Sequence, residues 1–294
     1  MSSRRTPRTP LPRALVEGTT RVVGILGNPV DHSLSPRMHN AAYAALDLDY
    51  VYVPFRAMPA TIRGAVRAMN TLGIVGFNVT VPYKQDVVKL VNRLTPTAAA
   101  IGAVNTIYRE GSDVVGDNTD AAGFSEALRS HGVKLRGAHV LVIGAGGSAR
   151  AVLHALREGG AGDVVLANRT VLTARRLARE FAATAVGLDA LEHEALLASR
   201  TLVVNSTPIG LEGGAYLDYR AAATPKGCMH FDLAYGRGLT PFLALAQRAG
   251  RPILDGRHML VHQGAVAFRR FTGRKAPVDV MLEAVGLAPA ARKR

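Results

Sequence analysis

One lysine stands where it could move a proton. Residues 73–79 have the apolar character of a strand, and Pro82 is expected to end the pairing of that strand and to fix the turn that projects Lys84. Only six of the 36 basic residues are lysines. Arginine keeps its proton near neutral pH, whereas lysine can release one. A lysine at this turn therefore favours a proton-transfer role, and a solvated surface lysine is the alternative.

Asp120 is the candidate partner of this lysine. It opens a helix expected over residues 120–131, so a structural role as helix N-cap is available to it. A carboxylate within a few ångströms of an amine would instead hold the amine in place and couple the two titrations. The residues alone leave both interpretations of Asp120 open.

A glycine-rich loop indicates a second chemistry. Branched apolar residues at 140–143 precede a loop of small residues, and a helical pattern follows it. The loop consists of Gly144, Ala145, Gly146, Gly147 and Ser148. In such a unit, Gly144 allows the turn and Gly146 lets the backbone approach a pyrophosphate, which free N–H groups at the helix start can bind. The loop predicts a dinucleotide site, with a structural turn that binds no ligand as the alternative.

The segment after the next apolar run, at 164–167, indicates which dinucleotide is bound. Units that bind NAD usually place an Asp or Glu there to hold the ribose, but this chain has Asn168, Arg169 and Thr170. An acidic residue would repel a 2'-phosphate, whereas Arg169 would attract one and Thr170 could hydrogen-bond it. The sequence therefore favours NADP over NAD.

Two serines follow the first predicted strand, at residues 21–26. Ser33 and Ser35 stand just ahead of Pro36 and an apolar-periodic helix. Ser35 has a structural explanation as an N-cap before a proline at the first helical position. Hydroxyl groups and helix N–H groups that converge at the end of a strand also suit a carboxylate ligand.

The pattern of elements predicts an α/β fold in two domains, with the boundary near residues 120–136. Strands are expected at 50–55, 103–108, 114–116, 201–204 and 228–233, and helices at 61–72, 85–94 and 174–181. A last helix is expected from residue 256 to about 271. The predicted division is a disordered basic tail at 1–20, a substrate-binding and catalytic domain at 21–120, a dinucleotide-binding Rossmann domain at 121–255, and C-terminal helices at 256–294.

Composition excludes several classes of protein. The net charge of +14 is spread along the chain, aromatic residues make up 5%, and no nucleic-acid-binding motif is present, so nucleic acid is not an expected partner. A single cysteine, Cys228, excludes an internal disulfide framework and fits a reducing, cytoplasmic setting. No apolar run is long enough to span a membrane. His258 and His262 are spaced i, i+4 without a third ligand nearby, so no metal is expected.

Taken together, these segments resemble the shikimate dehydrogenase family. The resemblance runs from about residue 22 to 275 and rests on motifs in the family's order. They are GNPV-x-HSLSP-x-MHN, NVT-x-P-x-K, GA-x-NT, NTD-x-x-G, GAGG-x-x-x-A, NRT, N-x-TP-x-G, D-x-x-Y and G-x-x-ML-x-x-Q-x-A. It implies an N-terminal α/β substrate domain, a Rossmann NADP domain and a last helix that returns to the first domain.

The resemblance also implies an activity and a set of site residues. NADPH would reduce 3-dehydroshikimate to shikimate in the cleft between the domains, with Lys84 and Asp120 as the catalytic dyad. Substrate would be bound by Ser33, Ser35, Thr80, Asn105, Asp120, Tyr235 and Gln263. The cofactor would be bound by Gly144, Ala145, Gly146, Gly147 and Ser148 at the pyrophosphate, by Asn168, Arg169 and Thr170 at the 2'-phosphate, and by Thr207, Leu233, Gly256 and Met259 near the nicotinamide.

Other activities share these features. Quinate and aminoshikimate dehydrogenases have the same motifs, and Ser35 in place of threonine favours shikimate. A non-catalytic NADP-binding regulatory module is a further alternative, against which the presence of both Lys84 and Asp120 argues. Short-chain dehydrogenases are disfavoured because no Tyr-x-x-x-Lys occurs. Either a monomer or a homodimer is compatible with the sequence.

Overall fold

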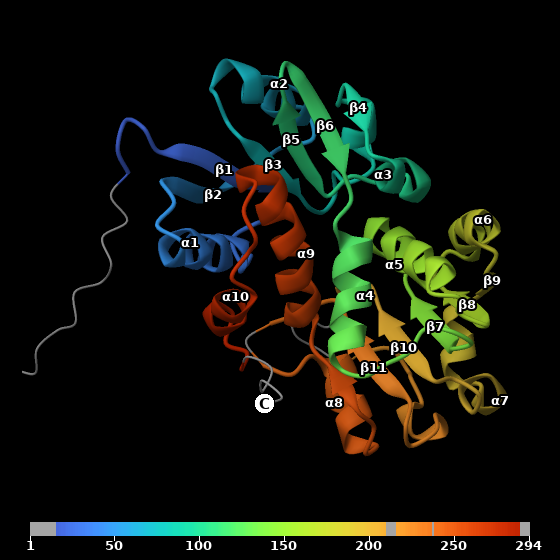
Figure 1. Cartoon of the computed structure of the whole chain (residues 1–294). Coiled ribbons are helices and arrows are strands. Elements are labelled where there is room, and N and C mark those ends of the chain that lie inside the picture. Colours follow the sequence, from blue (N-terminus) through green and yellow to red (C-terminus); the bar gives the residue numbers. More distant parts are fainter. Residues whose placement is uncertain (1–15, 210–215, 237, 289–294) are drawn as a thin grey trace, which may run out of the picture.

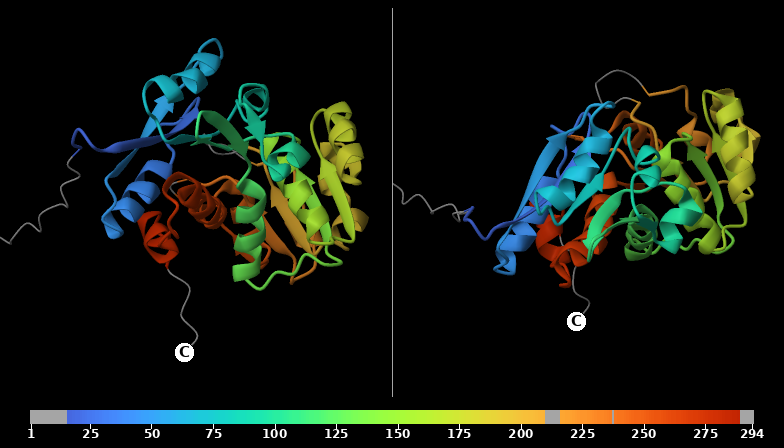
Figure 2. Two further views of the ribbon diagram at one scale, coloured as in Figure 1. Left: turned by 45° about the horizontal axis from the view of Figure 1, so that its top comes forward. Right: turned by 90° about the horizontal axis from the view of Figure 1, so that it is seen from above.

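The computed structural model describes residues 16–209, 216–236 and 238–288. Two six-stranded sheets lie side by side, and helices cover them (Figures 1 and 2). The predicted α/β fold with two sheets is confirmed. Residues 1–15 of the predicted tail lie outside the described residues. The ordered chain begins before residue 21, since the hydroxyls of Thr19 and Thr20 donate to the carboxylate of Asp49.

The first sheet is mixed and has the order β2-β1-β3-β5-β6-β4. β1 is parallel to both of its neighbours, while β5 runs antiparallel to β3 and to β6. Its strands are β1 (Arg21–Gly27), β2 (Tyr50–Arg56), β3 (Gly76–Val79), β4 (Arg93–Leu94), β5 (Thr106–Glu110) and β6 (Asp113–Asp117), and its helices are α1 (Ser35–Ala45), α2 (Ile62–Thr71) and α3 (Pro96–Ile101). β5 and β6, where strands were expected at 103–108 and 114–116, pair as an antiparallel hairpin.

The second sheet is parallel throughout, in the order β12-β11-β10-β7-β8-β9. Its strands are β7 (His139–Ile143), β8 (Asp163–Ala167), β9 (Thr184–Val186), β10 (Leu202–Asn205), β11 (Met229–Asp232) and β12 (Ile253–Leu254). Its helices are α5 (Gly147–Glu158), α6 (Val171–Phe181), α7 (Glu194–Leu197) and α8 (Pro241–Arg248). The strand order reverses between β7 and β10, which places the glycine loop after β7 at the point where such sheets bind ligands.

Two helices join the halves of the molecule. α4 (Asp120–Ser130) leaves the first sheet for the second, and α9 (Gly256–Thr272) returns and packs along α4 and against α1 (Figures 1 and 2). A Cβ on Gly123 of α4 would lie 2.6 Å from the backbone N of Gln263 on α9, so this close crossing requires glycine. α10 (Val278–Ala284) then packs on α1. The predicted return of the C-terminal helix to the first domain is confirmed.

Two local predictions are wrong. Instead of a helix at 85–94, the chain forms a short 3₁₀ turn, Asp86–Lys89, and then β4. Backbone N–H groups of Asn92 and Thr95 donate to carbonyls of β6, and this sheet pairing replaces further helical turns. Ser35 is not the N-cap of α1, because that position is Leu34 and the helix begins at Ser35.

Candidate active site

Lys84 and Asp120 meet at the centre of the molecule. The turn after β3 positions Lys84, whose backbone carbonyl accepts a hydrogen bond of 2.7 Å from the N–H of Val104. Asp120 is the first residue of α4, and its N-cap is Thr119. Lys84 Nζ lies 2.6 Å from Asp120 Oδ2, and the two side chains are only 13% and 7% exposed. The structure thus brings together the amine and the carboxylate that the sequence predicted to pair.

The glycine loop contacts this pair. Ser148 Oγ lies 3.4 Å from Lys84 Nζ, and a Cβ on Gly147 would lie 3.3 Å from Cβ of Lys84. The lysine side chain therefore runs along the loop that the sequence assigned to a dinucleotide. An ammonium group has three N–H donors. Asp120 and Ser148 engage two of them, which leaves one for a further acceptor.

Asn105 binds the carboxylate of Asp120 and links it to Thr119 and Gln263. Asn105 Nδ2 donates to Asp120 Oδ1 at 2.8 Å and to Thr119 Oγ1 at 3.0 Å, and it lies 3.3 Å from Gln263 Oε1. The N–H of Thr119 donates in turn to Asn105 Oδ1 at 2.7 Å. Gln263 comes from α9, more than 140 residues along the chain from Asp120. The network orients Asp120 and places the predicted Asn105 and Gln263 beside it.

Hydroxyl groups gather at the other predicted substrate positions. The N–H of Ser35 donates to Ser33 Oγ at 3.3 Å, and Ser35 is buried. Burial raises the pKa of Tyr235, and hydrogen bonds with the backbone of Leu34 and with Ser33 partly offset that rise. The loop after β11 is thus brought to the two serines. Thr80 follows β3, and its methyl group fills the space beside Gly27.

Two residues of this cluster were not predicted from the sequence. Tyr52, in mid-β2, donates from its hydroxyl to Asn78 Oδ1 at 2.8 Å, and both residues are buried. Burial raises the pKa of Tyr52, while a hydrogen bond with Ser35 lowers it. The tyrosine hydroxyl therefore faces the serines. Asn78 is the first residue of the NVT-x-P-x-K motif, but no role was predicted for it.

The glycine loop has the geometry that the sequence predicted. Gly144 has φ +103°, and a Cβ there would lie 2.6 Å from Ser206 Oγ and 2.7 Å from Thr207 Cγ2, so no larger residue fits. A Cβ on Gly146 would meet no atom within 4 Å. Gly146 is the N-cap of α5 and lacks a side-chain cap, so N–H groups at this helix start are free to bind an anion.

The predicted 2'-phosphate residues lie together after β8. Asn168 Nδ2 donates to the carbonyl of Thr170 at 3.0 Å, which shapes the turn. Arg169 and Thr170 are exposed. Among the residues that the structure describes, no carboxylate pairs with the Arg169 guanidinium. The turn therefore presents a cation and a hydroxyl to solvent.

Of the predicted nicotinamide positions, Thr207 and Leu233 follow β10 and β11, and Gly256 and Met259 lie at the start of α9. Thr207 donates from both its N–H and its hydroxyl to Asn205 Oδ1, and Gly256 packs on the carbonyls of Asp232 and Leu233. Met259 is buried in the core of the second sheet. Asn205 Nδ2 donates to Asp232 Oδ1 at 2.9 Å. Burial raises the pKa of Asp232 to about 6, and the sequence did not assign this carboxylate a place in the network.

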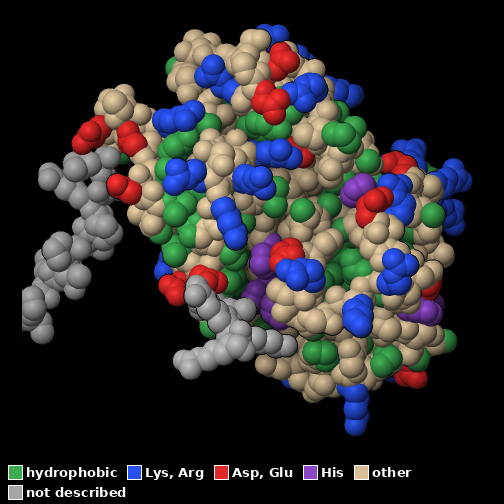
Figure 3. All heavy atoms as spheres, viewed as in Figure 1, with side chains coloured by type: hydrophobic (Ala, Val, Ile, Leu, Met, Phe, Trp, Pro, Cys, Tyr) green, Lys and Arg blue, Asp and Glu red, His purple; other side chains and the backbone are tan. Residues whose placement is uncertain are grey.

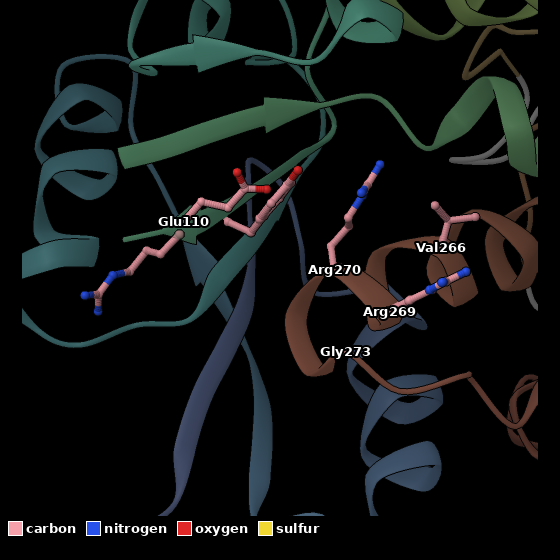
Figure 4. A pocket seen from close by; sticks show the side chains of 7 residues that line it. Glu110, Val266, Arg269, Arg270 and Gly273 are labelled. Atoms are coloured by element: carbon pink, nitrogen blue, oxygen red, sulfur yellow. The ribbon is translucent and has the colours of Figure 1, made fainter. Parts of the chain in front are cut away.

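A pocket elsewhere on the surface contains none of these residues. It has a volume of about 500 Å³ and lies between β5 and the end of α9 (Figure 4). Arg270, one of its lining residues, donates to Asp117 Oδ2 at 2.9 Å and lies over the ring of Tyr108. Because Arg270 is already engaged and the predicted site residues lie elsewhere, the pocket is not the candidate active site.

Neither the charges on the face shown in Figure 3 nor the histidines of the described residues indicate a second site. On the face in Figure 3, Lys and Arg side chains are scattered among acidic and apolar ones. Within residues 16–209, 216–236 and 238–288, no three His, Cys, Asp or Glu side chains are arranged to hold a metal ion. None of the helices in that part of the chain has both the length and the apolar character needed to cross a membrane.

Comparison with family models divides the chain as the fold does. The model of the shikimate dehydrogenase substrate-binding domain matches residues 25–107. The shikimate/quinate 5-dehydrogenase model matches residues 125–244, and the shikimate 5'-dehydrogenase C-terminal domain matches residues 256–285.

Individual relatives agree over nearly the whole chain. The NADP(+) shikimate dehydrogenase of Methanopyrus kandleri is 44% identical over 92% of this chain and 96% of its own. The structure of Thermus thermophilus shikimate 5-dehydrogenase with NADP(H) and shikimate superposes with a TM-score of 0.82 at 37% identity. The match covers 90% of this chain and 98% of the Thermus chain. Quinate dehydrogenase from Corynebacterium glutamicum, solved with NAD, has a TM-score of 0.82 at 29% identity, with coverage of 90% and 98%. The chain belongs to the shikimate dehydrogenase family.

Proposed function

We propose that this protein catalyses the reversible, NADPH-dependent reduction of 3-dehydroshikimate to shikimate, a step toward chorismate and the aromatic amino acids. The buried contact of Lys84 with both Asp120 and the glycine loop carries the proposal, because it joins a proton donor to a dinucleotide loop. Family membership supplies the substrate class. We further propose a cytoplasmic location, since Cys228, the single cysteine, is unpaired.

Lys84 is the proposed general acid of the reduction. NADPH, when bound along the glycine loop, supplies the hydride that adds to the carbonyl carbon. Lys84 Nζ gives a proton to the carbonyl oxygen, and in the oxidation of shikimate it takes that proton back. Asp120 Oδ2 holds the amine at 2.6 Å, and its other oxygen is held by Asn105. Asp120 thus keeps the Lys84 amine in place in both directions of the reaction.

The remaining groups are proposed to fix the substrate. Ser33 and Ser35, with Tyr235 beside them, would bind the carboxylate of 3-dehydroshikimate, because their hydroxyls converge after β1 and β11. Thr80, Asn105, Asp120 and Gln263 would hold the ring hydroxyls. The ring is thereby held between the serine cluster and the lysine.

The proposed cofactor site follows the second sheet. Gly144, Ala145, Gly146, Gly147 and Ser148 would hold the pyrophosphate at the start of α5. Asn168, Arg169 and Thr170 would bind the 2'-phosphate, which supports NADP over NAD. The nicotinamide would lie near Thr207, Leu233, Gly256 and Met259. These residues follow β10 and β11 or lie at the start of α9, the helix that returns to the half of the molecule that contains Lys84.

Quinate is a second candidate substrate, favoured by the likeness to the Corynebacterium enzyme. Turnover of shikimate and of quinate, each with NADP and with NAD, is followed by absorbance at the reduced nicotinamide band. We expect the largest kcat/KM with shikimate and NADP. Preferred oxidation of quinate would select the second candidate, and the absence of turnover with all four combinations would contradict a dehydrogenase function.

A further inference from the structure

Arg150 ties the helix of the cofactor loop to the opposite half of the molecule. It lies in the first turn of α5, and its side chain is only 17% exposed. Its Nε donates to the backbone carbonyl of Ile101, the last residue of α3. Its Nη2 donates to Glu180 on α6, and the guanidinium lies 5.6 Å from the centre of the Phe181 ring. One side chain thus connects three helices from both halves.

The end of α3 is shaped to receive this guanidinium. Gly102 caps α3 in the left-handed region, with φ +68°. A Cβ on Gly102 would lie 2.7 Å from Arg150 Nη2, so a side chain there would displace the arginine. The last carbonyls of a helix lack partners within the helix and carry partial negative charge, which a cation stabilises. The left-handed backbone of Gly102, the space beside it and the partial negative charge of the last α3 carbonyls all suit the guanidinium of Arg150.

The segment held by Arg150 leads directly to the catalytic pair. Two residues after Gly102, the N–H of Val104 donates to the backbone carbonyl of Lys84 at 2.7 Å. The next residue, Asn105, donates from its side chain to Asp120 Oδ1 at 2.8 Å. Only three residues therefore separate Ile101, whose carbonyl Arg150 binds, from Asn105, whose amide orients Asp120. A shift of this segment would move both members of the pair.

We propose that Arg150 is a positioning residue that sets Lys84 and Asp120 relative to the cofactor loop. The proposal rests on the proposed function, because it concerns the geometry of that same reaction. Arg150 lies in the first turn of the helix whose loop is to hold the pyrophosphate, and it fixes the segment on which the proton-transfer pair depends. Distances between hydride donor, substrate and proton donor govern the chemical step strongly, so an error of about 1 Å can lower the rate about a hundredfold.

The test compares Arg150→Met and Arg150→Lys with a matched control, Glu180→Gln. Methionine keeps the aliphatic bulk and loses the donors, while lysine restores one donor and the charge. Glu180→Gln removes the charge partner on α6 and leaves the bond to Ile101. Shikimate oxidation with NADP gives kcat and KM. NADPH fluorescence gives the dissociation constant of NADPH and the concentration of its binding sites. Dividing the rate by the concentration of binding sites gives kcat for folded protein only.

We expect Arg150→Met to lower kcat per site at least tenfold, Arg150→Lys to recover part of that loss, and Glu180→Gln to stay within about threefold of wild type. The NADPH dissociation constant should stay within about threefold in all variants. A kcat for Arg150→Met within twofold of wild type would overturn the proposal. So would a loss confined to NADPH affinity, which would make Arg150 a cofactor ligand. Failure of the wild-type chain to oxidise shikimate would instead reject the proposed function.

Discussion

Single residues carry the proposed chemistry, and the Lys84 amine is the most informative of them. It is nearly buried, and it donates to one carboxylate and one hydroxyl. Residue type and the rigid turn at Pro82 were sufficient to nominate it and Asp120 from the sequence. Tyr52 was not predicted, because a tyrosine in a strand normally packs in a core, and only the fold shows that its hydroxyl reaches Asn78. A side chain's direction depends on long-range packing that local patterns do not contain.

Replacing Lys84 by alanine should abolish most turnover without loss of cofactor binding. We expect kcat for shikimate oxidation to fall at least about a hundredfold, the usual scale for a lost general acid or base. NADPH binding, measured by its fluorescence, should stay near normal. Lys89→Ala is the matched control, because Lys89 is an exposed lysine five residues further on, and it should retain wild-type kcat. Near-wild-type turnover of Lys84→Ala would reject its assignment as the general acid.

Arg169 should discriminate between the two nicotinamide cofactors. Its guanidinium is exposed after β8, where a 2'-phosphate would lie. A charge-assisted hydrogen bond contributes about 1.5–3 kcal/mol, so Arg169→Ala should raise KM for NADP roughly ten- to a hundredfold and hardly change KM for NAD. Arg179→Ala, at the other end of α6, is the control and should change neither. Equal increases for both cofactors would contradict a phosphate-binding role.

At the scale of elements, most of the longer strands and helices were predictable, whereas the strands of two or three residues, β4, β9 and β12, were not. The runs that became β1, β7 and α9 have clear periodicity or continuous apolar character, and they lie where the sequence placed them. β4 has two residues, and it forms because its backbone pairs with β6 rather than through any local preference. The predicted helix at 85–94 failed for the same reason. The crossing of α4 and α9 could not be seen in either helix alone.

That crossing yields a prediction about glycines inside helices. An added Cβ on Gly123 would press against Cβ, Cα and backbone N of Gln263, none of which can move independently of α9. We expect Gly123→Ala to lower the free energy of unfolding by about 1–3 kcal/mol and to reduce turnover, since it displaces Gln263. Urea denaturation followed by circular dichroism measures the first effect.

Gly64 provides the matched control for this substitution. It lies inside α2, and a Cβ there would meet nothing within 4 Å. Gly64→Ala should therefore stabilise the protein by about 0.5–1 kcal/mol, through the better helix propensity of alanine alone. If both substitutions stabilise the protein to a similar extent, then α4 and α9 do not approach as closely as the structure indicates.

For the whole molecule, α4 and α9 join the two sheets (Figure 1), and Lys84, which follows β3 of the first sheet, contacts Asp120 at the start of α4. The sequence predicted a domain boundary near residues 120–136, and the family resemblance implied which part binds substrate and which binds NADP. Whether the protein is a monomer or a homodimer stays a prediction. The sequence did not indicate that the fold buries several histidines and thereby lowers their pKa values.

Burial lowers the pKa of His39 to about 3 and that of His230 to about 4. Below pH 6.5 the unfolded chain binds a proton at each of these residues, while the native state does not. The free energy of unfolding therefore decreases as the pH is lowered, until the pH reaches the pKa of the folded state. Asp232 acts in the opposite direction, because its folded pKa of about 6 lies above the unfolded value and favours the native state as the pH falls. Burial also lowers the pKa of His258 to about 4, so the histidines outweigh Asp232 and the free energy of unfolding falls as the pH drops from 5.5 to 4.5.

His39 allows that balance to be tested with one substitution. Its ring stacks on Tyr52 with centroids 4.4 Å apart, and neither ring nitrogen has a hydrogen-bond partner among the described residues. His39→Phe keeps the stacking and removes the titrating group. As the pH is lowered from 5.5 to 4.5, the variant should therefore lose about 1.4 kcal/mol less of its free energy of unfolding than the wild type does. Urea denaturation at both pH values measures the slope. His32→Gln, at an exposed position, should leave the wild-type slope unchanged, and an unchanged slope in His39→Phe would show that protons are taken up elsewhere on unfolding.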